Sequence, residues 1–379
     1  MSAAGPLAVD TEGAAPFGGR RAKRAAGGDI RAVATPLRLA IAGFGAFGQQ
    51  HAATARANPE CTLVAIADPA PDAPARAAAI GVAAYADPVA MLDAVAPEAL
   101  IVATPNAEHV PVALAAVERG IAVFVEKPIA ESLDRARVLV EASAARDVPV
   151  LVGHHRRYNP VIEDARAAAA SGALGRIVAV HAFFVIRKPD EYFDVRWRRE
   201  PGGGPLLINA IHDIDNLRYI VGEIDEVEAM TASTARQLAV EDTAAALLRF
   251  AGGALGTLVV SDASPAPWSW ELTSGEAARY PQRPGDCYFI AGTAGSLALP
   301  SSTAWHYAGV PSWTEPLAST RRDVTPADPQ LRQLAHFLRV ARRIERPRID
   351  AADAFRTLAV TAAIAESATR RAPVKVART

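Results

Sequence analysis

The chain has 379 residues, of which 50% are hydrophobic and 21% charged, and its formal net charge is −1. This length predicts two domains, and the balanced charge gives no reason to expect nucleic acid or an anionic membrane as a partner. Two cysteines, Cys61 and Cys287, are too few for a disulfide framework, and no apolar run reaches the roughly 18 residues of a membrane span, so we expect a cytoplasmic protein.

The first 36 residues differ in composition from the rest of the chain. Residues 1–36 are rich in Gly, Ala and Pro and carry a basic cluster at residues 20–24. No apolar segment of 7–15 residues follows this cluster, so we reject a twin-arginine export signal. We expect residues 1–36 to form a disordered extension.

A glycine motif follows the first apolar run. Residues 39–42 predict a buried strand, and the next residues contain the Gly-x-Gly-x-x-Gly pattern of Gly43, Gly45 and Gly48. These glycines suit a tight turn, a close approach to a pyrophosphate and close helix packing, respectively. A second apolar strand, residues 63–67, ends at Asp68, where a carboxylate can meet an adenosine ribose.

Strands and helices then alternate up to residue 152. Further strands are expected at 99–103, 121–125 and 148–152, with helices at 109–119 and 132–146. This alternation predicts a doubly wound parallel sheet, and we assign it to a dinucleotide-binding domain of residues 37–155. Ligands bind beyond the carboxyl ends of such strands. The segments found there are Thr104-Pro-Asn106, Glu126-Lys127-Pro128 and the run from His154 to Pro160.

The pattern changes near Gly175. Strands in a meander are expected at 176–186, 226–235, 243–250, 254–260, 287–291 and 296–299, with a hairpin turn at Gly252-Gly253. One helix is expected to start near Leu206, after a glycine-rich turn. We assign residues 156–329 to a second, substrate-binding and oligomerisation domain. Residues 330–379 are expected to supply C-terminal helices, 328–343 and 351–369, that pack back on the first domain.

Six motifs together resemble one family. They are AGFGAFGQQHA from Ala42, ADP from Ala67, ATPNAEH from Ala103, EKPIA from Glu126, RRYNP from Arg156 and GGGPLLINAIHDID from Gly202. From about residue 37 to 376 the chain resembles the glucose–fructose oxidoreductase / inositol dehydrogenase / rhizopine-catabolism (Gfo/Idh/MocA) family. The resemblance implies an α/β Rossmann domain plus an α+β domain with an open, mostly antiparallel sheet. It also implies a homodimer or homotetramer formed through that sheet, and oxidation or reduction of sugars, inositols and related alcohols with NAD or NADP.

The expected cofactor site lies along the strand ends. Asp68 should accept hydrogen bonds from a ribose diol and repel a 2′-phosphate, which favours NAD over NADP; Arg76 is the only cation nearby. His109 and Asn106 are expected to shape the cofactor cleft rather than do chemistry. The full set is Gly43, Phe44, Gly45, Ala46, Phe47, Gly48, Asp68, Thr104, Pro105, Asn106, His109, Glu126 and Lys127.

Two residues are expected to be catalytic. Lys127 follows the fourth predicted strand and can bind the alcohol oxygen or shuttle its proton. The resemblance makes it the family's active-site lysine; the alternative is a surface salt bridge with Glu126. His212 is the preferred general base because imidazole titrates near neutral pH, the alternative being a buried histidine of the core.

The predicted helix around His212 carries a polar arc. Asn209, His212, Asp213 and Asn216 fall within roughly 100° of each other, and Asp215 at the border could orient or charge-balance His212. Family members that oxidise polyols commonly have a carboxylate four residues before this histidine, where this chain has Ile208. This departure argues against an inositol-type site but leaves hydride chemistry intact.

Further substrate contacts are expected on either side of this helix. Arg156 or Arg157, if one faces the pocket, would favour a carboxylate-bearing substrate; otherwise both are surface arginines at a helix start. Tyr192 and Trp197 could stack on a sugar ring or serve in packing. His154 and His155 have no third ligand at a suitable spacing, so no metal site is expected.

These residues predict an NAD-dependent oxidoreductase acting on a secondary alcohol of a sugar, cyclitol or sugar acid. Two alternatives remain open. One is a glycosidase of the same fold that uses bound NAD for transient oxidation, and the other is a non-catalytic protein that senses dinucleotides. Lys127 and His212 argue against the second alternative.

Overall fold

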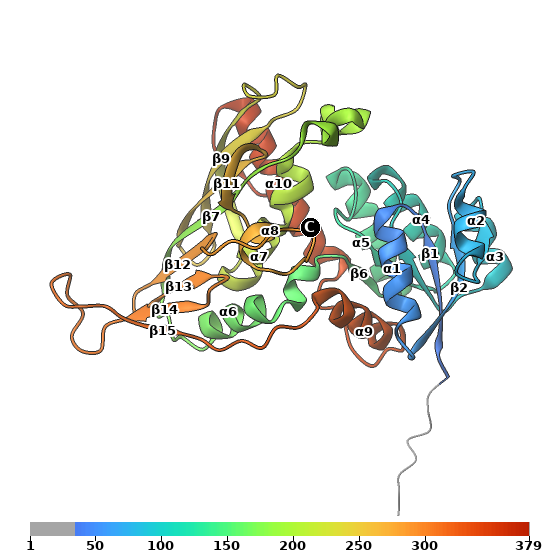
Figure 1. Ribbon diagram of the computed structural model, residues 1–379, viewed down its shortest axis with the longest axis horizontal. Coiled ribbons are helices and arrows are strands. Elements are labelled where there is room, and N and C mark those ends of the chain that lie inside the picture. The colour runs from blue at the N-terminus through green and yellow to red at the C-terminus, as the bar shows by residue number, and fades with distance from the viewer. Residues whose placement is uncertain (1–34, 379) are drawn as a thin grey trace, which may run out of the picture. The chain divides into compact units, whose positions relative to one another are not determined.

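The computed structural model describes residues 35–378, and the predicted N-terminal extension up to residue 34 lies outside them (Figure 1). The first sheet has six parallel strands in the order β3-β2-β1-β4-β5-β6. The strands are β1 Leu37–Ala42, β2 Cys61–Ala67, β3 Ala83–Tyr85, β4 Ala99–Val102, β5 Ala122–Val125 and β6 Val150–Val152. The predicted doubly wound sheet is confirmed, but with one strand more than expected. Strand β3 was missed because Ala83–Tyr85 is three residues long, has no buried residue and carries no apolar run.

Helices cover both faces of this sheet (Figure 1). They are α1 Ala46–Arg56, α2 Ala73–Ala78, α3 Pro88–Val95, α4 Asn106–Glu118 and α5 Leu133–Arg146. Side chains of the central strands enter a different core on each face: Ala40 and Leu100 on one, Leu39 and Ile101 on the other. Residues buried on both faces of a strand explain the continuous apolar runs in the sequence. Sequence reasoning did not assign α3, although Asp87 caps it and Pro88 starts it, which is a common helix-start signal.

The second sheet is mixed, and its strand order is β15-β14-β13-β12-β7-β10-β9-β8-β16, with β11 pairing to β7. The strands are β7 Ile177–Arg187, β8 Ile224–Ala232, β9 Thr243–Phe250, β10 Leu255–Ser261, β11 Ala263–Trp268, β12 Tyr288–Gly292, β13 Ser296–Leu299, β14 Thr303–His306, β15 Ala318–Arg321 and β16 Val374–Lys375. The open, mostly antiparallel sheet is confirmed. The expectation of one continuous meander is wrong, because β7 lies between β12 and β10 and runs parallel to β10. The hairpin at Gly252-Gly253 is confirmed, with Gly253 at φ +88°.

The helices of the second half are α6 Pro160–Ala170, α7 Ile211–Val221, α8 Trp270–Thr273, α9 Pro329–Ala341 and α10 Ala351–Arg370. The predicted helix near Leu206 begins instead as a π-helical turn, η4 (Leu206–Ala210), before α7 starts. Helix α10 packs against both sheets, since Phe355 and Leu358 enter the core of the first sheet while Val360 and Ile364 enter that of the second. Among residues 35–378, no helix combines the length and apolarity that crossing a bilayer requires. The predicted domain boundaries stay a prediction.

A buried ion-pair cluster joins α10 to α7 and to the 3₁₀ turn η1 (His155–Tyr158). The carboxylate of Asp353 in α10 contacts Arg157 and lies 2.8 Å from Nη2 of Arg218. Burial on its own would raise the pKa of Asp353, but the charges and hydrogen bonds of Arg157 and Arg218 hold it well below its usual range. The cluster therefore contributes stability that is present above the unfolded-state pKa and lost as the pH falls.

We expect Asp353→Asn to lower the free energy of unfolding at pH 7 by about 3–5 kcal/mol, because it leaves two buried guanidinium groups short of a partner. The loss should shrink as the pH falls below about 4, where the unfolded carboxyl takes up a proton. Urea unfolding at pH 7 and at a pH below about 4 measures the free energy of unfolding of both proteins. The control is Asp93→Asn, which removes an exposed pair with Arg119 and should cost at most about 1 kcal/mol. Equal losses in both variants would contradict the assignment.

Candidate active site

The glycine motif forms the turn between β1 and α1. Gly43 has φ +89°, and a Cβ there would lie 2.4 Å from the carbonyl oxygen of Ala103. A Cβ on Gly48 would lie 2.0 Å from the carbonyl oxygen of Gly43, whereas one on Gly45 would meet nothing within 4 Å. Gly43 and Gly48 therefore permit the turn and its packing. Gly45 leaves open space beside the N-terminus of α1, as a pyrophosphate requires, so this turn fits a dinucleotide.

Asp68 follows β2 and lies against the glycine turn. Its carboxylate accepts hydrogen bonds from the backbone N–H of Phe44 at 2.5 Å and of Ala70 at 2.9 Å. Arg76, in α2, donates to the carbonyl oxygen of Phe44 at 2.7 Å, and its guanidinium lies 5.2 Å from the centre of the Phe44 ring. Asp68 and Arg76 thus both hold the turn.

The loop after β4 is tied to the loop after β5 by His109. The ring of His109 is buried, with Nδ1 2.7 Å from the carbonyl oxygen of Pro128 and Nε2 2.9 Å from that of Thr104. Burial lowers its pKa. Helix α4 begins at Asn106, directly after Pro105. His109 therefore holds the two strand ends together, and its role in shaping a cofactor cleft stays a prediction.

Glu126 and Lys127 follow β5 and have different partners. The Glu126 carboxylate lies 2.7 Å from Nε2 of His51 in α1, and its other oxygen accepts from the backbone N–H of Lys127 at 3.1 Å. Burial would raise the pKa of Glu126, but the hydrogen bond and charge of His51, with the charge of Lys127, lower it overall. The alternative of a salt bridge between the two side chains is wrong, since Lys127 Nζ donates instead to a backbone carbonyl.

That carbonyl belongs to Ile208 in η4, which lies 3.0 Å from Lys127 Nζ. The contact brings a strand end of the first sheet to the segment that leads into α7. Desolvation is the main cause that lowers the pKa of Lys127 to about 8, and the charge of Arg156 lowers it further, while Glu126 opposes both. An ammonium group that loses its proton this easily can exchange protons near neutral pH.

His212 lies in α7 with 7% of its surface exposed. Its pKa is well below the usual value, first because of desolvation and then because of the charges of Lys127 and Arg156. The centres of the His155 and His154 rings lie 5.2 and 6.2 Å from that of His212. Within residues 35–378, Nδ1 of His212 makes no hydrogen bond. The structure therefore presents a neutral imidazole within electrostatic reach of the Lys127 ammonium.

A buried charge cluster lies beside His212 and was not predicted. Nη1 of Arg156 lies 2.9 Å from Asp213, and Nη2 lies 2.6 Å from Glu271 in α8. The hydroxyl of Tyr288 also contacts Asp213 and accepts from Asn216 at 3.1 Å. Burial raises the pKa of Asp213 to about 7, although Arg156 opposes this. Glu271 and Tyr288 were missed because both lie in the second sheet region, at least 50 residues beyond the end of α7 along the chain.

Arg157 and Asp215 belong to the ion-pair cluster at α10 instead. Arg157 contacts both oxygens of Asp215, at 2.8 and 2.7 Å, and Asp215 also accepts from Thr357. His154 Nδ1 lies 3.8 Å from Asp215. The expectation that Asp215 orients His212 is therefore wrong, because its oxygens accept from Arg157 and Thr357 instead. Neither arginine is a surface residue, since Arg156 and Arg157 are each 4% exposed.

The two aromatic candidates lie in the segment between β7 and η4. Tyr192 is in the 3₁₀ turn η2 (Asp190–Asp194) and Trp197 in η3 (Arg196–Arg199). The guanidinium of Arg198 lies 4.1 Å from the Tyr192 ring centre and 5.4 Å from that of Trp197, and Lys188 Nζ lies 4.6 Å from the Tyr192 ring centre. Both rings therefore contact cations, and their stacking on a sugar stays a prediction. Asn209, in η4, has a buried Oδ1 with no hydrogen bond in the described part of the chain.

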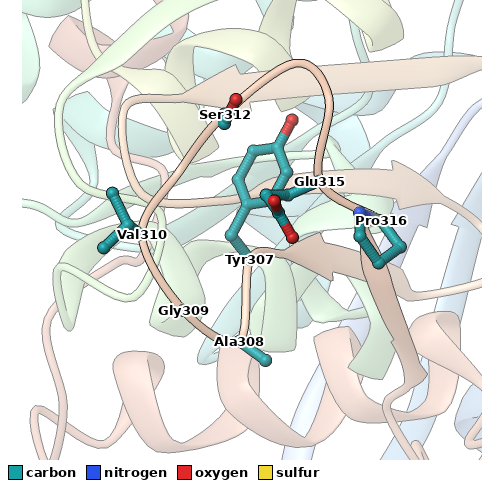
Figure 2. Close-up of a pocket in the computed structure, with 7 residues that line it drawn as sticks. All are labelled: Tyr307, Ala308, Gly309, Val310, Ser312, Glu315 and Pro316. Carbon is teal, nitrogen blue, oxygen red and sulfur yellow. The ribbon is translucent and has the colours of Figure 1, made fainter.

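A hollow of about 330 Å³ lies within the loop between β14 and β15 (Figure 2). Its walls are residues of that loop, and it contains none of the predicted site residues. We therefore do not assign the active site to it. Across residues 35–378, no group of three or more His, Cys, Asp or Glu side chains is arranged to hold a metal ion.

Comparison with known proteins places both halves of the chain. Residues 37–154 match a family model described as an oxidoreductase family with an NAD-binding Rossmann fold, and residues 162–298 match the GFO/IDH/MocA C-terminal domain. The predicted NAD-binding domain is thereby confirmed.

The chain is also similar to named proteins. It is 27% identical to rhizopine catabolism protein MocA of Rhizobium meliloti over 50% of this chain and 58% of that protein. It is 31% identical to inositol 2-dehydrogenase 4 of Saccharopolyspora erythraea over 54% of this chain and 59% of that protein. The chain thus matches less than two thirds of the length of either relative. The solved structure of the WlbA dehydrogenase from Bordetella pertussis, in complex with NADH and UDP-GlcNAcA, superposes with a TM-score of 0.74. It has 25% sequence identity, and the match covers 91% of this chain and 100% of that one.

Proposed function

Because the chain belongs to the Gfo/Idh/MocA oxidoreductase family, we propose that it transfers hydride between NAD and a secondary alcohol of a sugar, cyclitol or sugar acid. The main support is the contact of Lys127 Nζ with the Ile208 carbonyl. It joins the strand end after β5, on the dinucleotide side, to the segment that carries His212. A substrate bound between them would meet a proton donor and a proton acceptor at once.

In this proposal, the residues of the chain bind the alcohol and move its proton. Lys127, in its ammonium form, donates a hydrogen bond to the reacting oxygen and stabilises the negative charge that develops there. His212, in its neutral form, accepts the hydroxyl proton as the carbonyl forms. When NAD⁺ is bound, its nicotinamide supplies the hydride acceptor. The glycine turn and Asp68 would hold the dinucleotide, and the loop tied by His109 would border its cleft.

The direct test is a screen of neutral sugars, inositols and sugar acids with NAD and NADP in parallel, followed by absorbance at 340 nm. We expect turnover with at least one class of alcohol and a preference for NAD, because Asp68 would repel a 2′-phosphate. A clear preference for NADP would refute the role of Asp68. Sugar release without net absorbance change would favour the glycosidase alternative. Dinucleotide binding without turnover would favour the sensing alternative.

The pH dependence of the reaction should follow Lys127. Because its pKa is lowered to about 8, kcat/KM for alcohol oxidation should fall as the pH rises above about 8 and the ammonium loses its proton. No rising limb is expected near pH 6.5, because the pKa of His212 lies well below its usual value. Initial rates from about pH 5.5 to 9.5 measure this. A rise with a midpoint near 8 would instead make neutral Lys127 the base.

The second sheet also supports a homo-oligomer, as a dimer or tetramer. Helices α7 and α10 cover one face of it (Figure 1). In β9, Leu247 is 56% exposed between the buried residues Ala246 and Leu248, so it points to the opposite face. Exposed apolar side chains on neighbouring strands are Val178, Met230, Leu255 and Phe289. Patches of this kind commonly mark interfaces between protein chains. Light scattering should give a mass of at least two chains, and a monomer at micromolar concentration would contradict this.

We further propose a cytoplasmic location.

A further inference from the structure

Lys127 and two cations whose charges act on it, Arg156 and Lys188, differ in how they are paired. Arg156 contacts two carboxylates, Asp213 and Glu271, at 2.9 and 2.6 Å. The ammonium of Lys188, at the end of β7, lies 3.1 Å from the buried carboxylate of Asp262. In the described range 35–378, Lys127 Nζ has no carboxylate within ion-pair distance. Two of the three positive charges are thus neutralised by the protein itself.

One carboxylate oxygen of Glu271 has no hydrogen-bond donor in the described part of the chain. Glu271 lies in α8, whose first turn is held by the Ser269 side chain, which accepts from the backbone N–H of Leu272. One oxygen, Oε1, accepts from Arg156, while Oε2 is buried and makes no hydrogen bond to any residue between 35 and 378. Desolvation lowers the pKa of both Lys127 and Lys188, and the charge of Glu271 opposes this lowering in each. The carboxylate therefore lies within electrostatic range of both.

Segment η4, which contacts Lys127 through the Ile208 carbonyl, holds a second acceptor that is unpaired within residues 35–378. That segment has Ile208 where family members that oxidise polyols commonly have a carboxylate, and the Ile208 backbone oxygen accepts from Lys127 Nζ. The neighbouring amide oxygen, Oδ1 of Asn209, is buried without a hydrogen bond in the described chain. Two buried acceptors, Glu271 Oε2 and Asn209 Oδ1, thus have no hydrogen-bond donor among residues 35–378. Hydroxyl groups donate hydrogen bonds, whereas an ionised carboxylate can only accept them.

We propose that Glu271 is a specificity-determining residue that accepts a hydrogen bond from a substrate hydroxyl and so selects neutral polyhydroxy substrates over sugar acids. This inference rests on the proposed dehydrogenase function and narrows its substrate class. A substrate carboxylate would face the Glu271 carboxylate, and the neighbouring Arg156 is already paired with Asp213 and Glu271, so the juxtaposition of like charges is strongly unfavourable. A neutral polyol meets no such repulsion and satisfies the free acceptors.

The experiment compares matched neutral and acidic substrates, such as glucose with glucuronate and a panel of inositols with aldonates, using the full chain and NAD. We expect wild-type kcat/KM to favour the neutral class by at least about 100-fold, since a buried like-charge contact costs this much or more. Glu271→Gln keeps the shape but removes the charge. This variant should reduce the ratio of kcat/KM for neutral substrates to that for acidic substrates by at least about tenfold, mainly by lowering KM for the acids. Glu271→Asp keeps the charge and should retain the preference.

The control is Glu276→Gln, in the segment that follows α8. Both oxygens of Glu276 are engaged, by His155, Asn159 and Trp270, so its loss should affect the two substrate classes alike. Thermal unfolding establishes that each variant is folded. Wild-type turnover of sugar acids equal to that of neutral polyols would overturn the inference while leaving the proposed function intact. An unchanged preference for neutral over acidic substrates in folded Glu271→Gln would also overturn the inference and leave the proposed function intact. No turnover of any alcohol would overturn the proposed function and this inference with it.

Discussion

Replacing Lys127 with alanine is expected to lower kcat by about 10²–10⁴, which is the usual contribution of a group that transfers or holds a proton in the transition state. Among residues 35–378, Lys127 Nζ has one hydrogen-bond partner, the carbonyl of Ile208, and no carboxylate within ion-pair distance. Its charge is therefore not cancelled by a carboxylate and can act on the reacting oxygen. Initial rates with the substrate found in the screen measure the loss, and kcat should fall more than KM changes.

Two measurements separate this effect from misfolding. Dinucleotide binding, followed by the fluorescence of NADH, should persist in Lys127→Ala because the glycine turn and Asp68 are untouched. Lys375→Ala, which removes an exposed lysine in β16, should turn over like wild type. Wild-type turnover in Lys127→Ala would remove Lys127 from the mechanism.

The first half of the fold was predictable because its signals are local. A glycine turn, apolar runs of strand length and helix caps such as Ser132 each act within a few residues, so the sequence alone places them. The same locality placed Lys127 at a strand end. Prediction from local signals failed at β3. Its three residues have no buried side chain, and they take their conformation from pairing with β2 rather than from their own composition.

The candidate site was predictable only in part because its charges come from distant segments. Arg156 and Arg157 are adjacent in the sequence, yet one pairs with Asp213 and Glu271 and the other with Asp215 and Asp353. No spacing rule separates their roles, since neighbouring residues in η1 point to different parts of the protein. Ile208 illustrates a second limit. The family resemblance marked a missing carboxylate there, whereas the structure uses the backbone carbonyl to hold Lys127.

Replacing His212 with asparagine is expected to lower kcat by about 10²–10⁴, on the same scale as Lys127→Ala, because the hydroxyl proton would lose its acceptor. Asparagine can still hydrogen-bond a substrate hydroxyl, so KM should change much less than kcat. A second readout follows from the charges. Burial and the Lys127 charge lower the pKa of His212, so the wild-type imidazole is neutral over the whole pH range in which Lys127 titrates. Losing it should therefore lower the rate without moving the falling limb near pH 8.

The matched control is His154→Asn, which changes a second buried histidine whose ring centre lies 6.2 Å from that of His212. His154 lies 3.8 Å from Asp215, on the side of the ion-pair cluster, so this change should affect stability more than kcat. If both variants lost activity to the same extent, the imidazole of His212 would have no special role in proton transfer. The base would then have to be sought in Lys127 itself, and the pH profile would rise through 8 instead of falling.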